Sequence, residues 1–278
     1  MKQRLIVSFS GGLTSAFMAH ELLTKYSAIY ELLFVFANTG QEWEQTLVFV
    51  DRCSHEWNIE IVWVEAVVSP IRGIGTSHRI VDFETASRNG EPFEAVIVKY
   101  GIPNKPFPHC TRELKKNTIN SWRRSIGWGN SLMAIGIRAD EPRRVRKDAD
   151  KQGIIYPLVS MFPTIKEMVN DWWSEQPFKL GLLPHQGNCS WCWKKSTPKL
   201  LRIAKESRHV FDFPARMEEQ YTMAGPSGQP QVFFRDWRST KDLLQLADMI
   251  DSPKLFIEHE DEDAGCSESC EAFGGEDT

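Results

Sequence analysis

The chain has 278 residues, of which 41% are hydrophobic and 25% are charged, and its formal net charge is −4. This composition predicts an ordinary soluble globular protein with a buried core, and the charge gives no overall argument for binding nucleic acid. No apolar stretch approaches the ~20 residues that a membrane span needs, and no signal peptide precedes the first strand. We therefore expect a cytoplasmic protein with no membrane partner.

The first half of the chain alternates between short apolar runs and amphipathic segments. The runs predict strands, and the segments with apolar residues on one helical face predict helices. The expected elements are strands at 5–9, 31–37 and 59–64, with helices at 14–25 and 42–57 between them. A β-α-β-α-β order predicts a parallel sheet with right-handed crossovers, and so an α/β fold.

Glycine, proline and charge interrupt this alternation between residues 69 and 108, which predicts an insertion over one end of the sheet. The elements expected after it are a helix at 111–126, a strand at 131–137, and helices at 164–173, 198–206 and 240–250. We divide the chain into an α/β domain (1–160), a mostly helical, cysteine-bearing region (161–257) and an acidic, mobile tail (258–278).

The stretch "SFSGGLTS" at residues 8–15 follows the first strand directly. A glycine-rich turn from strand to helix exposes backbone N–H groups at the positive end of the helix dipole, which favours an anion there. The lysine of a Walker loop is missing. The alternative is a tight turn capped by Ser10, without a ligand.

Four stretches together resemble a known family. "SGGLTS" is similar to the PP-loop of the ATP pyrophosphatase superfamily, and more closely to its phosphoadenylylsulfate (PAPS) reductase branch. "FANTGQEWEQTLVFV", "GIRADEPRR" and "YPLVSMFPTIKEMVNDWW" resemble further elements of that branch. The motifs occur in the family's order over about residues 4 to 200.

The resemblance implies a Rossmann-like adenine nucleotide alpha hydrolase fold that binds ATP or PAPS at the carboxyl ends of the parallel strands. The residues expected to bind the nucleotide are Ser8, Ser10, Gly11, Gly12, Leu13, Thr14, Ser15, Asn38, Thr39, Gly136 and Arg138. Leu13 stands where relatives often place a basic residue, so the contribution of Arg138 becomes more necessary.

Charged residues follow the predicted fourth strand. A guanidinium at Arg138 can pair with a phosphate or sulfate through two hydrogen bonds. Asp140 and Glu141 are candidates for Mg²⁺ ligands, or for local salt bridges in a solvated loop. Four basic side chains come next, and they fit either a 3′-phosphate or nucleic-acid backbone, or a plain solvated turn: Arg143, Arg144, Arg146 and Lys147.

Cys189 and Cys192 have the C-x-x-C spacing that lets two thiolates reach one metal or cluster. The alternative is a pair of incidental thiols, and Cys53 is expected in the core. Cluster-bearing relatives draw cysteines from the regions of Cys110 and of this pair. The resemblance thus implies a [4Fe–4S] cluster on Cys110, Cys189 and Cys192, with zinc as the alternative. The reductases use a Cys-Cys pair where this chain has His109-Cys110, so the fourth position stays open, or is taken by His109 or His185.

Two further cysteines, Cys266 and Cys270, lie in the acidic tail. PAPS reductases use a cysteine near the C-terminus to attack sulfur, although this chain lacks their Glu-Cys-Gly-Leu-His-like segment. Neighbouring carboxylates also raise a thiol pKa, which opposes that role. The residues predicted to be catalytic are Arg138, Cys110 and Cys266.

Three functions remain open from the sequence. The first is reduction of activated sulfate to sulfite, with a thioredoxin- or glutaredoxin-type donor as partner. The second is ATP-dependent sulfur transfer to a nucleic acid through the cluster. The third is a nucleotide-binding subunit without its own catalysis. A homo-oligomer is compatible with each.

Overall fold

The computed structural model describes residues 2–71, 73–226 and 228–250, and these residues form a six-stranded sheet in the order β4-β3-β2-β1-β5-β6. The strands are β1 (Gln3–Ser8), β2 (Tyr30–Asn38), β3 (Ile61–Val68), β4 (Thr76–Val81), β5 (Leu132–Ala134) and β6 (Ile154–Ile155). β4 runs antiparallel to β3, and the other neighbours are parallel. The predicted α/β class and the largely parallel sheet are therefore confirmed.

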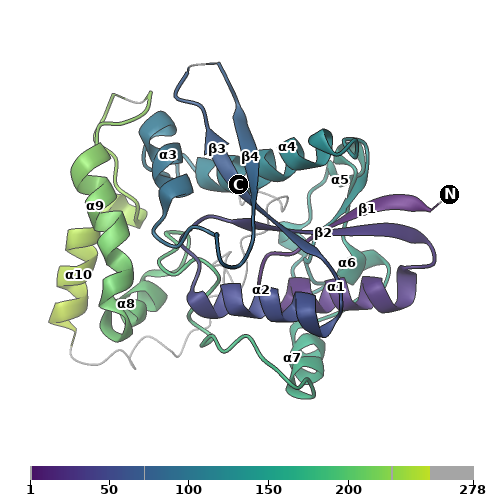
Figure 1. The fold of residues 1–278 in the computed structure, drawn as a ribbon. Helices are drawn as coiled ribbons and strands as arrows, with labels where there is room; N and C mark the ends of the chain where they lie inside the picture. The colour runs from purple at the N-terminus through teal and green to yellow at the C-terminus, as the bar shows by residue number, and fades with distance from the viewer. Residues whose placement is uncertain (1, 72, 227, 251–278) are drawn as a thin grey trace.

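Helices connect and flank these strands (Figure 1). The α-helices are α1 (Leu13–Tyr26), α2 (Glu44–Glu56), α3 (Glu91–Tyr100), α4 (Thr118–Ser125), α5 (Ala149–Gln152), α6 (Pro157–Ser160), α7 (Lys166–Ser174), α8 (Thr197–Glu206), α9 (Asp212–Tyr221) and α10 (Thr240–Met249). A π-helix, η1 (Thr111–Asn117), precedes α4, and short 3₁₀ turns are η2 (Pro142–Arg144), η3 (Arg208–Phe211) and η4 (Arg235–Trp237).

The sheet is covered on both faces, as a mostly parallel sheet requires. Figure 1 shows α1, α2 and α7 on one side of the sheet and α4 on the other. Neighbouring residues of β1 alternate between these layers: Leu5 and Val7 belong to the hydrophobic cluster with α1 and α2, whereas Ile6 packs with Trp122 of α4. Because successive side chains of a strand point to opposite faces, the buried strand β1 contributes to two hydrophobic clusters, one on each face of the sheet.

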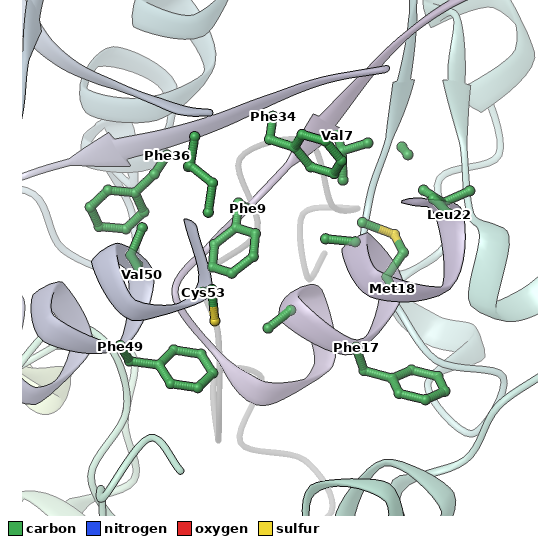
Figure 2. Packing of buried hydrophobic residues seen from close by; sticks show 14 of the residues in the cluster. Val7, Phe9, Phe17, Met18, Leu22, Phe34, Phe36, Phe49, Val50 and Cys53 are labelled. Atoms are coloured by element: carbon green, nitrogen blue, oxygen red, sulfur yellow. The ribbon is translucent and has the colours of Figure 1, made fainter. Parts of the chain in front are cut away.

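Aromatic rings fill the space between β1, β2 and the two helices α1 and α2 (Figure 2). Phe9, Phe36 and Phe49 are each at most 2% exposed, and Cys53 is fully buried beside them. The prediction that Cys53 belongs to the core is confirmed. This packing holds the turn from β1 into α1, where the glycine-rich stretch lies.

The structure differs from the predicted elements in the middle of the chain. The segment 69–108 contributes β4 to the edge of the sheet and also forms α3, so it is more regular than the expected insertion. The expected helix at 111–126 is divided into η1 and α4. The expected strand at 131–137 ends as a strand at Ala134, because the chain then bends toward α1.

The C-terminal portion of the described chain is helical, as expected. Residues of α3, α8, α9 and α10 share one hydrophobic cluster with Trp191 and Trp193. The helix α10 begins with a complete capping box between Ser239 and Asp242. Among the described residues, no helix is long and apolar enough to cross a bilayer. Cys266 and Cys270 lie outside the described residues.

Candidate functional site

The glycine-rich loop joins the end of β1 to the start of α1. Gly11 has φ 84°, and a Cβ built on it would lie 2.6 Å from Cγ2 of Thr46. Only glycine fits this position without strain, for conformational and steric reasons together. The loop is closed by Ser15, whose Oγ accepts from the Ser10 amide at 3.1 Å and donates to the Gly12 carbonyl at 3.0 Å.

The first turn of α1 has no side-chain cap, since Gly12 occupies the N-cap position. Uncapped N–H groups at a helix N-terminus carry partial positive charge and attract anions. Ser10 and Ser15 bond to each other at 2.8 Å between their hydroxyl oxygens, so they shape the loop. The expected cap by Ser10 is therefore not formed, and the uncapped turn is compatible with the expected anion loop.

Arg138 reaches this first turn from the segment after β5. Its side chain is only 7% exposed, and Nη1 donates to Oγ1 of Thr14 at 3.3 Å. Gly136 allows the approach, because a Cβ there would lie 3.0 Å from the Cα of Ser15. The structure thus brings together the loop, Gly136 and Arg138, although 124 positions separate Thr14 from Arg138 in sequence.

Two carboxylates hold the Arg138 segment from the other side. Asp140 accepts from Nε of Arg138 at 2.9 Å and from Nη2 at 3.3 Å. Glu141 accepts from the Arg138 amide at 3.1 Å and forms an ion pair with Arg144. Both carboxylates therefore make the local salt bridges that were the alternative to a Mg²⁺ site.

Some of the other basic side chains in this stretch also form ion pairs with nearby acidic residues. Arg146 forms an ion pair with Asp148 at 2.9 Å, and its amide donates to the Tyr156 hydroxyl at 3.2 Å. Arg144 likewise forms an ion pair with Glu141. Two of the four side chains predicted to bind phosphate therefore have acidic partners. The stretch is less available to a polyanion than its sequence suggests.

The two residues at the end of β2 that were predicted to bind the nucleotide already form hydrogen bonds within the protein. Asn38 is fully buried, and its Nδ2 donates to Oε1 of Glu65 at 2.6 Å and to the Ser87 carbonyl at 2.9 Å. Thr39 donates to Glu42 twice, from its amide at 3.0 Å and from its hydroxyl at 2.8 Å. Both residues shape the loop after β2. They lie at the carboxyl end of β2, beside the glycine-rich loop at the carboxyl end of the parallel strand β1.

Sequence reasoning missed Glu65, which organises this edge of the sheet. Its carboxylate is fully buried in β3 and accepts from Asn38, from Arg79 on β4, and from the amide and hydroxyl of Ser87. A buried carboxylate is tolerated only with such partners. The signal was present, because one charge interrupts the apolar strand "IVWVEAVV".

The segment with Cys189 and Cys192 docks directly beside the glycine-rich loop. Asn188 donates from Nδ2 to the Ser10 carbonyl at 2.6 Å. Its own carbonyl accepts from the Trp43 amide at 3.1 Å, and the Ser190 amide donates to the Gln41 carbonyl at 2.9 Å. These bonds form a bridge between Cys189 and Glu42, which binds the two segments together.

The two thiols contact each other and a set of buried charges. A hydrogen bond with Cys192, together with burial, raises the pKa of the Cys189 thiol well above its usual range. Lys195, only 2% exposed, donates from Nζ to the Cys189 carbonyl. Burial also raises the pKa of Glu42, and the charge of Lys115 opposes that shift only in part. Lys115 and Lys195 were not singled out from the sequence.

The third predicted ligand, Cys110, directly precedes the π-helix η1 and packs against the hydrophobic cluster of Trp191 and Trp193. His109 donates from Nε2 to the Gly101 carbonyl at 2.9 Å, and burial lowers its pKa. His185 is bonded to Glu206 at 2.6 Å through Nε2.

Within residues 2–71, 73–226 and 228–250, no group of three or more His, Cys, Asp or Glu side chains is arranged to hold a metal ion. A [4Fe–4S] cluster or a closed zinc site needs three or four converging ligands, so the cluster expected on Cys110, Cys189 and Cys192 stays a prediction.

Two surface cavities lie away from these residues. One, of about 230 Å³, is lined by Gln3, Arg4, Trp128 and their neighbours at the amino end of β1. The other, of about 210 Å³, lies between Tyr100, Phe107 and Gln231. Cavity volume alone does not identify the site, because the glycine-rich loop lies at the carboxyl end of β1, a central strand of the sheet, and lines neither cavity.

Comparison with known proteins adds one relative. Over 281 aligned residues, the chain is 32% identical to a protein of Escherichia phage lambda described as an uncharacterized nin region protein, ORF290. The alignment covers 98% of this chain and 96% of that protein. No family model and no solved structure matches the chain.

Proposed function

The chain belongs to the family of the phage lambda nin region protein ORF290, and we propose that it is an enzyme that binds an adenine nucleotide at the glycine-rich loop. We propose that its fold is of the adenine nucleotide alpha hydrolase type. Within that fold it acts as a PAPS-reductase-like protein in sulfur metabolism. Its reaction is the reduction of activated sulfate to sulfite.

The contact between Arg138 and Thr14 carries this proposal. The buried guanidinium donates a hydrogen bond to Thr14 in the uncapped first turn of α1. This contact lies at the carboxyl ends of the parallel strands β1, β2 and β5. Helix N–H groups, a hydroxyl and a guanidinium together provide the charge that the missing lysine would supply. The same edge is where open α/β sheets place their ligands.

The roles of the residues follow from this geometry. The loop amides and Thr14 hold the phosphates of the nucleotide, and Arg138 stabilises the negative charge that develops on the leaving group. Asp140 keeps the guanidinium in position. The proposed nucleophile is the thiolate of Cys266, which attacks the sulfur and displaces the adenosine phosphate. A second thiol, from a thioredoxin-type donor, then releases sulfite and forms a disulfide. No step passes through a metal cluster.

A second function is favoured by the loop itself. Gly11 and Gly12 are both present, and ATP-cleaving relatives keep both glycines. In this alternative the loop holds the pyrophosphate of ATP, and cleavage at the α-phosphate activates an acceptor for sulfur transfer. The ion pairs of Arg144 and Arg146 weaken the case for a nucleic-acid acceptor, because these side chains already have partners.

Two assays separate these functions. Purified full-length protein is incubated with PAPS and a thiol reductant, and sulfite is measured. In parallel, it is incubated with ATP and magnesium, and AMP and pyrophosphate are measured. Sulfite release supports reduction, and AMP with pyrophosphate supports the second function. Nucleotide binding without turnover supports a non-catalytic subunit. Failure to bind either nucleotide contradicts all three.

A further inference from the structure

The cavity of about 230 Å³ lies at the amino ends of the parallel strands β1 and β5, whereas the glycine-rich loop lies at the carboxyl end of β1. Figure 1 marks this end of β1 with the letter N. The lining comes from the start of β1 and from the turn between α4 and β5, and it includes Gln3, Arg4, Trp128, Asn130, Ser131 and Leu132. The proposed nucleotide site uses none of these residues.

Arg4 brings a guanidinium to the wall of the cavity. Its Nη1 donates to the Gly127 carbonyl at 3.2 Å, and the group lies 5.1 Å from the centre of the Trp128 ring. Its ion pair with Glu31 is long, at 3.6 Å, and both side chains are more than half exposed, so this pair contributes little. A guanidinium has more N–H donors than these contacts use. Arg4 therefore has donors left for an anion in the cavity.

A second guanidinium, that of Arg123 on α4, contacts the same turn. Its Nη1 donates to the Ser131 carbonyl at 3.4 Å. Among the residues that the structure describes, its Nε is buried without an acceptor. Burial lowers the pKa of Arg123, the charge of Arg124 lowers it further, and no described acidic group opposes this shift. A positive charge that is partly buried without a counter-charge is unfavourable, and a bound anion would supply one.

The Ser131 side chain adds an unpartnered donor to the wall. Ser131 is 8% exposed, and its Oγ is buried with no hydrogen-bond partner in the described part of the chain. Buried polar groups nearly always have a partner, so an unpartnered hydroxyl on a residue that lines a cavity indicates a ligand. The exposed side chains of Gln3 and Asn130 bring amide groups to the rim.

We propose that this cavity binds a small organic phosphate monoester. Arg4 and Arg123 provide two positive charges against the one carboxylate of Glu31, which favours a phosphate dianion, and guanidinium groups pair well with phosphate oxygens. Trp128 and Leu132 give the organic part an apolar wall. The volume of about 230 Å³ lies below the ~300–1,000 Å³ of pockets for drug-sized ligands, so the ligand is small.

The first experiment compares three probes. Phenyl phosphate, inorganic phosphate and phenol are each titrated into the full-length protein by calorimetry. We expect saturable binding of phenyl phosphate and no measurable binding of phenol, which has no charge. Inorganic phosphate should bind on the order of tenfold more weakly, because it has no apolar part to bury against the wall. A short 5′-phosphorylated single-stranded DNA, titrated in parallel, tests nucleic acid as the source of the phosphate.

The second experiment locates the site. Arg4→Gln and Arg123→Gln should each weaken the binding of phenyl phosphate by on the order of tenfold, since each removes a charge-assisted contact. Arg52→Gln on α2 is the matched control. Like Arg4, Arg52 is about half exposed, lies over an aromatic ring (Phe178) and forms an ion pair with a glutamate (Glu56). It should leave the affinity unchanged.

A third variant closes the cavity and keeps both guanidinium groups. Asn130 is exposed at the rim, so Asn130→Trp fills space there without changing the core. We expect this variant to keep the circular dichroism spectrum of the wild type and to lose binding of phenyl phosphate.

Arg138→Lys separates this proposal from the proposed function. It changes the nucleotide site at the other end of the sheet, so the affinity for phenyl phosphate should stay at the wild-type value. Loss of binding in Arg138→Lys would place the probe at the glycine-rich loop and contradict the proposal. A protein that binds neither ATP nor PAPS but still binds phenyl phosphate refutes only the proposed function.

Four other results would overturn the proposal. They are no binding of phenyl phosphate, unchanged affinity in a folded Arg4→Gln protein, tighter binding of the DNA than of phenyl phosphate, and equal affinity for phenyl phosphate and inorganic phosphate. The last of these would indicate an adventitious ion only.

Discussion

Nη1 of Arg138 donates a hydrogen bond to Oγ1 of Thr14 at 3.3 Å, which joins the segment after β5 to the first turn of α1. The guanidinium is buried, and Asp140 holds its other edge at 2.9 Å. A positive charge in this position faces the uncapped end of a helix that also attracts anions. The two features reinforce each other at one point of the fold.

Replacing Arg138 by lysine should weaken binding of ATP or PAPS by on the order of tenfold or more, since lysine cannot keep the planar, paired contacts to Asp140 and the ligand. Calorimetric titration of each nucleotide measures the effect. Arg124→Lys, an exposed substitution on α4, is the matched control. Wild-type affinity in a folded Arg138→Lys protein would contradict the proposed site.

The Gly11→Ala variant should lose about 1–3 kcal/mol of unfolding free energy, because φ is 84° and the new Cβ would lie 2.6 Å from Thr46. Urea denaturation followed by circular dichroism provides the measurement. The control is Gly75→Ala, where a Cβ meets no atom within 4 Å. Equal urea midpoints for Gly11→Ala and Gly75→Ala would show that a side chain at position 11 does not strain the loop.

His109 should make the native state less stable in mild acid. Burial lowers its pKa from 6.5, Arg112 lowers it further, and the Gly101 carbonyl and Glu113 oppose the shift. At a pH below 6.5 the unfolded chain therefore binds a proton that the native imidazole does not bind. The free energy of unfolding decreases as the pH is lowered. His109→Gln, which retains an N–H donor, should lose less stability between about pH 7.5 and 5.5.

Urea midpoints at the two pH values test this expectation. His20, His78 and His185, whose pKa values burial also lowers, remain in the variant and contribute a residual slope. His55→Gln on the exposed face of α2 is the control. A variant with the same pH dependence as the wild type would exclude His109 as a source of the acid sensitivity.

Cys53 should resist alkylation in the native protein. It is fully buried between α1 and α2, and burial raises its thiol pKa far above the ordinary value, so almost no thiolate is present near neutral pH. Iodoacetamide treatment with and without urea, followed by peptide mass spectrometry, checks this. Fast modification of Cys53 without urea would show that the core opens more readily than its packing suggests.

The strands at 5–9, 31–37 and 59–64 were predictable because each consists mainly of apolar residues, and most of these side chains are buried. β4 was missed because its sequence, TSHRIV, is mostly polar and only Thr76 in it is buried, so it has neither an apolar run nor an alternating pattern. The division of residues 111–126 into η1 and α4 was also missed. Both segments have helical periodicity and both pack against β3 and β4, so no local pattern marks the change from π-helix to α-helix at Thr118.

Local sequence patterns were enough to predict the α/β class and the glycine-rich turn at 8–15, and to single out Arg138 and the C-x-x-C pair as candidates. These are local patterns, read from a few neighbouring residues each. The three-dimensional contacts were needed to find that Asn38 is already hydrogen-bonded to Glu65, that Glu65 also holds Ser87, and that Asn188 links the segment of Cys189 to Ser10. These contacts join residues far apart in the chain, and a side chain's partners are set by strand order and packing rather than by its neighbours in sequence.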